Sequence, residues 1–202
     1  VDQVHVDLCG ARPGKPAPNW GVCPGPAFGL ELRRRTGVPQ GLIACAHGGT
    51  TMEQWDPARR DEGGASLYGA LVRRLRKNGG RVAGLLWYQG CSDTNPSRLV
   101  ELYTPRMRKL FAAFRRDCQD PDLPVVLAQI GRVVGQDWSL AAGWNSIQEQ
   151  ERQFQQRVRR CAVVPVIDLA IDDGIHIGET EQHRLGRRFA QAMEALTGAP
   201  DA

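Results

Sequence analysis

The chain has 202 residues, of which 42% are hydrophobic and 24% charged, and its formal net charge is +4. These values are typical of one globular domain with a buried core, so we expect a single domain over residues 1–202. No apolar run is long enough to span a membrane, and the basic clusters lack the interleaved aromatic residues of a nucleic-acid groove. We therefore expect neither a membrane nor a nucleic acid as a partner.

The cysteines give no metal-binding signature. None of the six belongs to a C-x-x-C pair, which argues against a structural zinc site. Their even number is compatible with disulfides, so they leave the cellular compartment open. The six are Cys9, Cys23, Cys45, Cys91, Cys118 and Cys161.

Short apolar runs alternate with amphipathic segments along the chain. Runs that are apolar throughout are typical of strands buried on both faces of a parallel sheet. The pattern predicts strands over 4–8, 41–45, 82–88, 125–130 and 162–169, and helices over 26–36, 65–78, 97–117, 144–160 and 181–196. This β-α alternation predicts an α/β protein with three α/β/α layers around a central parallel sheet.

Polar residues follow three of the predicted strands directly. His47-Gly48-Gly49 follows the second strand, Gln89-Gly90-Cys91 the third, and Asp173-Gly174-Ile175-His176 the last. Because sites in open parallel sheets form beyond the carboxyl ends of the strands, we expect these segments to meet at one edge.

The residue types in these segments suit ester hydrolysis. A carboxylate three residues from an imidazole can hold it in one tautomer, so Asp173 is the expected orienting residue of a base, His176. Backbone amides at Gly48 and Gly49 and the side-chain amide of Gln89 could form an oxyanion hole. Each motif alone has an ordinary reading, since Gly-Gly and Asp-Gly are common turns and glutamine often only fixes a loop.

Three longer stretches resemble a known family. Residues 41–55, 86–93 and 173–176, with Gly25-Pro-Ala-Phe-Gly29 before them, are similar to motifs of SGNH-type hydrolases. The similarity is to the branch of sialate O-acetylesterases and acetylxylan esterases, and it extends from about Trp20 to about Met193.

The resemblance implies a flavodoxin-like fold and an activity. It implies deacetylation of an acetylated carbohydrate through attack by a serine and an acyl-enzyme intermediate, without metal or cofactor. By position, His176 is the implied base and Asp173 its partner, while Gly49, Gly48 and Gln89 form the oxyanion hole. A secreted or periplasmic location is slightly favoured by the same resemblance.

Two departures from the family pattern matter. The Gly-Gln-Ser-Asn block that carries the nucleophile is absent, and residues 1–20 contain no serine. We therefore expect the first strand and the nucleophile to be missing from this numbering and to come from a separate N-terminal segment. In addition, Cys91 replaces the glutamate of the family's Gln-Gly-Glu, which leaves Cys91 and Asp93 as supporting residues and places more weight on Asp173.

Three alternatives stay open at this point. The chain could be an inactive carbohydrate-binding relative whose tryptophans line a groove (Trp20, Trp55, Trp87 and Trp138), although we favour core packing for each of them. Cys91 could act as a thiol nucleophile with His176. The last alternative is a metal site built from Asp172, Asp173, His176, Glu179 and His183. We expect that no metal binds there.

Overall fold

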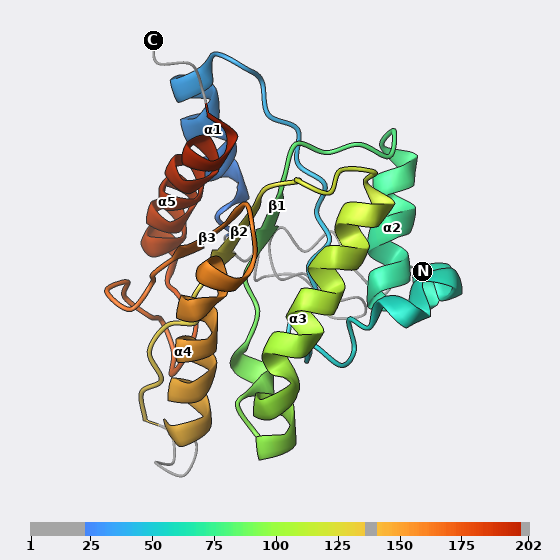
Figure 1. The fold of residues 1–202 in the computed structure, drawn as a ribbon. Helices are drawn as coiled ribbons and strands as arrows, with labels where there is room; N and C mark the ends of the chain where they lie inside the picture. Colours follow the sequence, from blue (N-terminus) through green and yellow to red (C-terminus); the bar gives the residue numbers. More distant parts are fainter. Residues whose placement is uncertain (1–22, 136–140, 199–202) are drawn as a thin grey trace, which may run out of the picture.

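The computed structural model of the protein describes residues 23–135 and 141–198 (Figure 1). Its sheet has three parallel strands in the order β1-β2-β3, and Leu85 of β1 and Cys161 of β3 both lie opposite Val125 of β2. All three carboxyl ends therefore lie at one edge of the sheet. The strands are β1 (Leu85–Trp87), β2 (Val125–Ala128) and β3 (Cys161–Val164).

Helices cover both faces of the sheet. In Figure 1, α1 and α5 lie side by side against one face, and α2 and α3 lie on the opposite side. The α-helices are α1 (Gly25–Thr36), α2 (Leu67–Lys77), α3 (Ser97–Asp117), α4 (Ala141–Arg157) and α5 (Glu179–Thr197), and two short 3₁₀ helices are η1 (Pro57–Ala65) and η2 (Cys91–Asp93).

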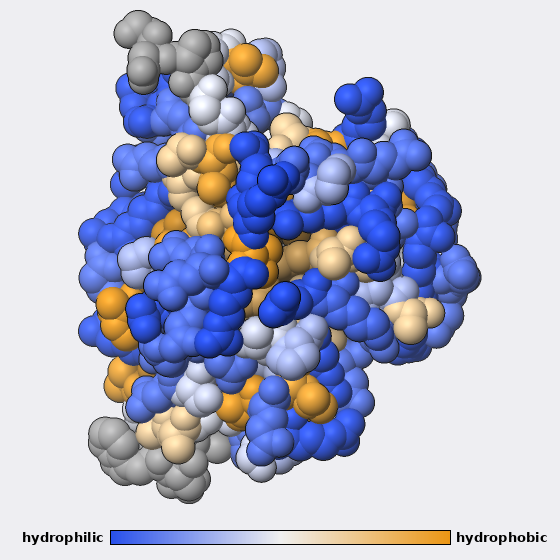
Figure 2. All heavy atoms as spheres, viewed as in Figure 1, coloured by the Kyte–Doolittle hydropathy of each residue, from blue (hydrophilic) through white to orange (hydrophobic). Residues whose placement is uncertain are grey.

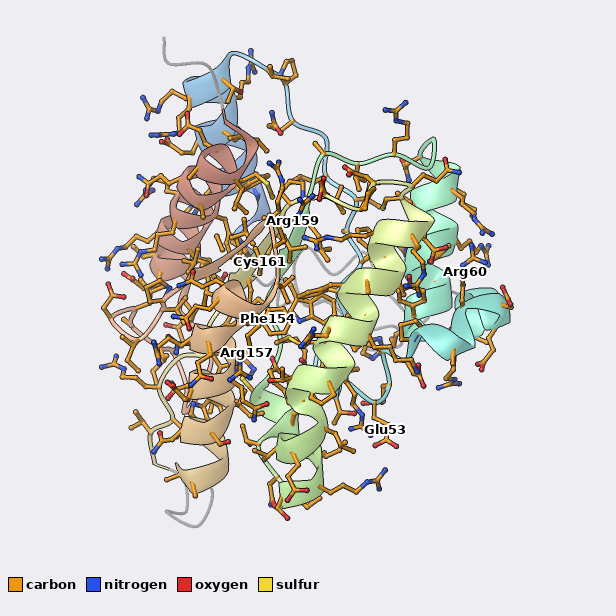
Figure 3. The ribbon with its side chains drawn as sticks, viewed as in Figure 1. Glu53, Arg60, Phe154, Arg157, Arg159 and Cys161 are labelled. Carbon is orange, nitrogen blue, oxygen red and sulfur yellow. The ribbon has the colours of Figure 1, made fainter. Side chains whose placement is uncertain are left out.

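The alternation of side chains along β2 divides the interior into two cores. Val126 and Ala128 belong to a core shared with α1 and α5, whereas Val125 and Leu127 belong to a larger core shared with α2, α3 and α4. Phe154 of α4 points into this larger core (Figure 3), where its ring packs edge-on against Phe111 at a centroid distance of 5.6 Å. The three layers expected from the sequence are thus confirmed.

The outer surfaces of the helices are mostly hydrophilic, as Figure 2 shows for one face of the molecule. Several arginines of the predicted basic clusters pair with acids, such as Arg34 with Glu31 and Arg188 with Asp168. Within residues 23–135 and 141–198, no helix is both long and apolar enough to cross a bilayer.

One predicted strand is wrong. The run 41–45 has no regular secondary structure, although its chain passes close to α2, where Arg74 donates to the carbonyl of Ala44 at 3.0 Å. Leu42 is 43% exposed, so the run does not have the two buried faces that its apolar character suggested. The predicted strand at 4–8 lies outside the described residues.

Two helical glycines give a matched test of the packing between α1 and α5. A Cβ on Gly186 of α5 would lie 2.4 Å from the carbonyl oxygen of Pro24 and 2.7 Å from Cβ of Ala27. A Cβ on Gly29 of α1 would meet only Cβ of Gln40, at an ordinary 3.6 Å.

We therefore expect Gly186→Ala to lower the free energy of unfolding by about 1–3 kcal/mol, because α5 must move away from α1. Gly29→Ala should leave it unchanged or raise it by up to about 1 kcal/mol, through the better helix propensity of alanine. Urea denaturation followed by circular dichroism measures both. Equal shifts in the two variants would contradict the close helix contact.

Candidate active site

An acid–base pair lies on the loop that follows β3. Nδ1 of His176 is 2.6 Å from Oδ2 of Asp173, and Oδ1 of Asp173 accepts the backbone N–H groups of Ile175 and His176, each at 2.7 Å. The bond from His176, followed by these two backbone bonds, lowers the pKa of Asp173 to about 2. The carboxylate is therefore ionised near neutral pH, and it orients the imidazole with Nε2 directed away from the acid.

Backbone hydrogen bonds hold this loop in place. Ile171 and Ile177 form an antiparallel bridge, and the amide of Asp172 donates to the carbonyl of His176 at 3.0 Å. The amide of Val134, beyond β2, donates to the carbonyl of Gly174 at 2.8 Å. The loop is thus attached to the neighbouring segment, although the side chain of His176 itself is 72% exposed.

The Gly48-Gly49 segment forms an exposed turn. Thr50 closes it by donating from Oγ1 to the carbonyl of His47 at 2.9 Å, and the same oxygen accepts from Nε1 of Trp55 at 3.0 Å. Gly49 has a φ of +69°, a left-handed conformation that favours glycine. Turn geometry alone therefore accounts for glycine at position 49.

Gln89 and Asp93 connect this turn to the end of β1. Nε2 of Gln89 donates to the carbonyl of Thr50 at 2.8 Å and to Oδ2 of Asp93 at 2.7 Å. Asp93 is fully buried and also accepts the amide of Met52 at 2.9 Å. Burial raises the pKa of Asp93, while the bonds from Gln89 and Met52 oppose that rise.

These contacts limit what Gln89 can do without rearrangement. Both hydrogens of its amide go to protein acceptors, and its Oε1 is buried without a hydrogen-bond partner. In this arrangement Gln89 positions the turn. Donation to an oxyanion requires it to release one of the two acceptors.

Cys91 lies between the two loops but is a poor nucleophile. Burial, with the charges of Glu151 and Asp173 adding to it, raises the pKa of the thiol to about 12. The thiol is therefore protonated at neutral pH, which argues against the thiol mechanism considered above. The effect of Asp173 on Cys91 also indicates that the loops after β1 and β3 approach each other.

The described serines do not form a nucleophile–base pair with His176. Ser66 is 2% exposed and caps α2, since its Oγ accepts from the amide of Gly69 and donates to the carbonyl of Arg59. Ser146 accepts a bond from Gln150 on its own helix. In the part of the chain that the structure describes, Asp173 is the one side chain hydrogen-bonded to the imidazole.

Two of the tryptophans proposed for a sugar-binding groove are in the core. Trp55 is 3% and Trp87 7% exposed, and their rings pack edge-on with centroids 5.2 Å apart. They are buried because they fill the space between the sheet and α3, so core packing, the reading favoured over a groove, is confirmed for these two. Trp20 and Trp138 lie outside the described residues.

A small polar pocket of about 190 Å³ adjoins the Gly48-Gly49 turn. Residues of the turn and its continuation form one wall, and η1 with the start of α2 forms the other. The lining residues are His47, Thr50, Gln54, Arg59, Ala65, Ser66 and Leu67. For the residues described, no group of three or more potential ligands (His, Cys, Asp, Glu) is arranged to hold a metal ion.

The site also contains residues that the motifs did not predict. Glu53 forms ion pairs with Arg98 and Arg106 of α3 and so attaches the segment after the turn to that helix (Figure 3). Glu151 and Tyr103 lie beneath Gln89 and are fully buried. The sequence signal for Glu151 is a charge within the apolar stripe of α4, between Ile147 and Phe154.

Gly48 and Gly49 provide a matched test of the turn. Gly49→Ala forces a left-handed backbone on alanine, which costs about 1–2 kcal/mol, so we expect a lower melting temperature. Gly48→Ala should be tolerated, because its φ is ordinary and nothing lies within 4 Å of the added Cβ. Thermal unfolding measures both, and an equal loss in Gly48→Ala would contradict this turn geometry.

Comparison with known proteins identifies the family of the chain. Residues 4–195 match the family described as carbohydrate esterase, sialic acid-specific acetylesterase. A probable carbohydrate esterase of Arabidopsis thaliana is 32% identical over 199 residues, which cover 95% of this chain and 68% of that protein.

Solved structures give the same result for the fold. An Arabidopsis thaliana protein superposes with a TM-score of 0.75 at 30% identity, covering 90% of this chain and 71% of the other. A carbohydrate acetylesterase from Xanthomonas citri gives a TM-score of 0.74 at 24% identity, covering 88% of this chain and 41% of the other. A family 3 carbohydrate esterase from Talaromyces cellulolyticus gives 0.54 at 14%, covering 88% and 92%. The chain therefore belongs to the sialic acid-specific acetylesterase family of carbohydrate esterases, which are carboxylic ester hydrolases.

Proposed function

We propose that the protein removes acetyl groups from sugars by a serine-hydrolase mechanism with an acyl-enzyme intermediate. The observation that carries this proposal is the 2.6 Å contact between His176 and an ionised Asp173, with the His176 side chain 72% exposed. This pair has the composition and geometry of a general base and its orienting acid.

In the proposed first step, Nε2 of His176 takes the proton from the attacking serine hydroxyl. The hydroxyl oxygen bonds to the acetyl carbon, and the carbonyl electrons move to its oxygen. The imidazolium formed is stabilised by Asp173 and returns its proton to the sugar oxygen as the ester bond breaks. Water then attacks the acetyl-enzyme by the same two proton transfers, releasing acetate and regenerating the serine.

The negative oxygen of the tetrahedral intermediate requires hydrogen-bond donors. The backbone amides of Gly48 and Gly49 are in an exposed turn next to Gln89. We propose that these amides form the oxyanion hole and that Gln89 joins it by exchanging its bond to the carbonyl of Thr50 for one to the oxyanion. A single such donor contributes about 3–4 kcal/mol to transition-state stabilisation.

We propose that the serine belongs to a segment outside residues 1–202. Two observations support this. The described serines do not bond to His176, and in the described sheet β1 pairs with β2 alone, which leaves its other edge for a further strand. Asp93 supports the site by fixing Gln89, while Cys91 contributes a neutral side chain and not a charge.

We propose an acetylated carbohydrate as the substrate. The support comes from the family and from the pocket beside the turn, whose imidazole, guanidinium, hydroxyl and amide groups are suited to sugar hydroxyls. Because Trp55 and Trp87 are buried, nothing in the described residues favours a purely sugar-binding role over catalysis.

The decisive experiment compares the longest natural gene product with a polypeptide of residues 1–202. We expect the longer protein to release acetate from acetylated xylan and p-nitrophenyl acetate, and the shorter one to release none above background. In the longer protein, His176→Ala should lower kcat/KM by about 10³-fold or more, and Asp173→Asn by about 10²–10⁴-fold.

His183→Ala is the matched control, because His183 lies on α5 outside the proposed machinery and its loss should leave the rate unchanged. If the longer protein folds but releases no acetate, it is an inactive relative and the proposal fails. If residues 1–202 alone are fully active, the nucleophile lies within them and the proposed origin of the serine is wrong.

A further inference from the structure

A buried carboxylate connects the ends of two strands beneath the site. Oε2 of Glu151, on α4, accepts the amide of Ile130 just beyond β2 at 2.7 Å. Oε1 of Glu151 lies 2.8 Å from the hydroxyl of Tyr103, and that hydroxyl lies 2.7 Å from the carbonyl oxygen of Gln89, just beyond β1. Through this chain of contacts, α3 and α4 hold the carboxyl edge of the sheet together.

The number of protons available to this series of contacts decides whether Glu151 is ionised. The Tyr103 hydroxyl has one proton, and two oxygens lie within hydrogen-bond distance of it. The carbonyl of Gln89 can only accept, and an ionised carboxylate can only accept as well, so one hydroxyl proton cannot serve both contacts. Both contacts are hydrogen bonds at the same time only if the carboxyl group of Glu151 carries a proton and donates it to the hydroxyl oxygen.

The surroundings of Glu151 favour the same state. The titratable groups that face it are Tyr103 from α3 and Tyr88 and Cys91 from the segment after β1, with Asp93 beyond Tyr103 and Asp173 beyond Cys91. No cation of the described residues is among the groups that shift the pKa of Glu151. Full burial raises this pKa from 4.5 to about 8, against the opposing effect of the hydrogen bonds with Ile130 and Tyr103.

The backbone next to Gln89 fits closely over this group. A Cβ on Gly90 would lie 2.8 Å from Oε1 of Glu151 and 3.1 Å from the Tyr103 hydroxyl, and Gly90 has a φ of +157°. The segment that presents Gln89 and Cys91 therefore rests directly on the Glu151–Tyr103 pair.

We infer that Glu151 is an un-ionised carboxylic acid at neutral pH and that, through Tyr103, it is a positioning residue that fixes the backbone of Gln89 at the edge of the sheet. Its effect on the reaction rests on the proposed esterase function, whereas its protonation state does not. If Glu151 is ionised, the one proton of Tyr103 faces two acceptors, the carbonyl of Gln89 and Oε1 of Glu151. One of these two oxygens then loses its hydrogen bond from Tyr103.

The conservative variant Glu151→Gln imitates the protonated form. Its side-chain amide can donate to the Tyr103 oxygen while its carbonyl accepts the amide of Ile130. Tyr103→Phe removes the link to Gln89. The matched control is Glu149→Gln on the same helix, because Glu149 is exposed and paired with Arg152, which lowers its pKa to about 2.

The direct test is infrared spectroscopy of the folded protein in H₂O and D₂O. Wild type at pH 7 should show the carbonyl stretch of a protonated carboxyl group, and this band should disappear with a midpoint near pH 8. The band should be absent in Glu151→Gln and retained in Glu149→Gln. A folded wild type without the band at pH 7 would overturn the inference.

Stability against pH gives an independent test. The native state holds a proton between pH 4.5 and about 8 that the unfolded state has released, so stability must fall as pH rises through this range. The free energy of unfolding of wild type, relative to that of Glu151→Gln, should fall progressively over this range. Above this range the difference between the two proteins should stay constant. A constant difference at every pH would contradict the inference.

In the acetate-releasing protein, kcat should fall above about pH 8 in wild type and in Glu149→Gln but not in Glu151→Gln. Tyr103→Phe should have a low kcat at every pH, whereas Glu151→Gln should not. If the infrared band is present but the protein releases no acetate, the proposed function fails and the assignment of Glu151 stands. An active Glu151→Gln variant with the wild-type alkaline fall would refute the positioning role.

Discussion

The geometry of the site depends on the hydrogen bonds that the buried side chain of Asp93 accepts. It accepts hydrogen bonds from the Met52 amide and the Gln89 side chain, and Gln89 in turn holds the carbonyl of Thr50. Without these bonds the buried carboxyl oxygens would lack donors, which costs about 1–3 kcal/mol for such a group. The Gly48-Gly49 turn therefore keeps its place at the end of β1 although the run that leads to it forms no strand.

The segment after β1 lies between two buried acids with different requirements. Asp93 accepts hydrogen bonds from two N–H donors, whereas Glu151 meets one N–H and one hydroxyl whose single proton is shared with the carbonyl of Gln89. Burial raises the pKa of both acids, and the N–H donors of Asp93 oppose that rise. Cys91 lies between the two acids as a neutral thiol.

Much of this architecture could be predicted from sequence because apolar runs and amphipathic periodicity are local signals. The three strands and the five helices follow from them, and the pairing of Asp173 with His176 follows from their spacing of three residues on one loop. The missing strand at 41–45 could not be predicted, since strand formation depends on a neighbour. Nor could the inward turn of Gln89 or the role of Glu151, which depend on contacts with residues 39 and 48 positions away. Core packing of Trp55 and Trp87, in contrast, was the reading favoured from the sequence, and the structure confirms it.

The exposure of His176 has a consequence for selectivity. Among the described residues the imidazole is 72% exposed on a surface loop, so under the proposed mechanism the alcohol that it protonates need not enter a cavity formed by these residues. On the same proposal, a departing saccharide of any length can extend into bulk water from this point. These residues then give no steric basis for discrimination by polymer size, and selection among esters falls to the acyl group and the first ring.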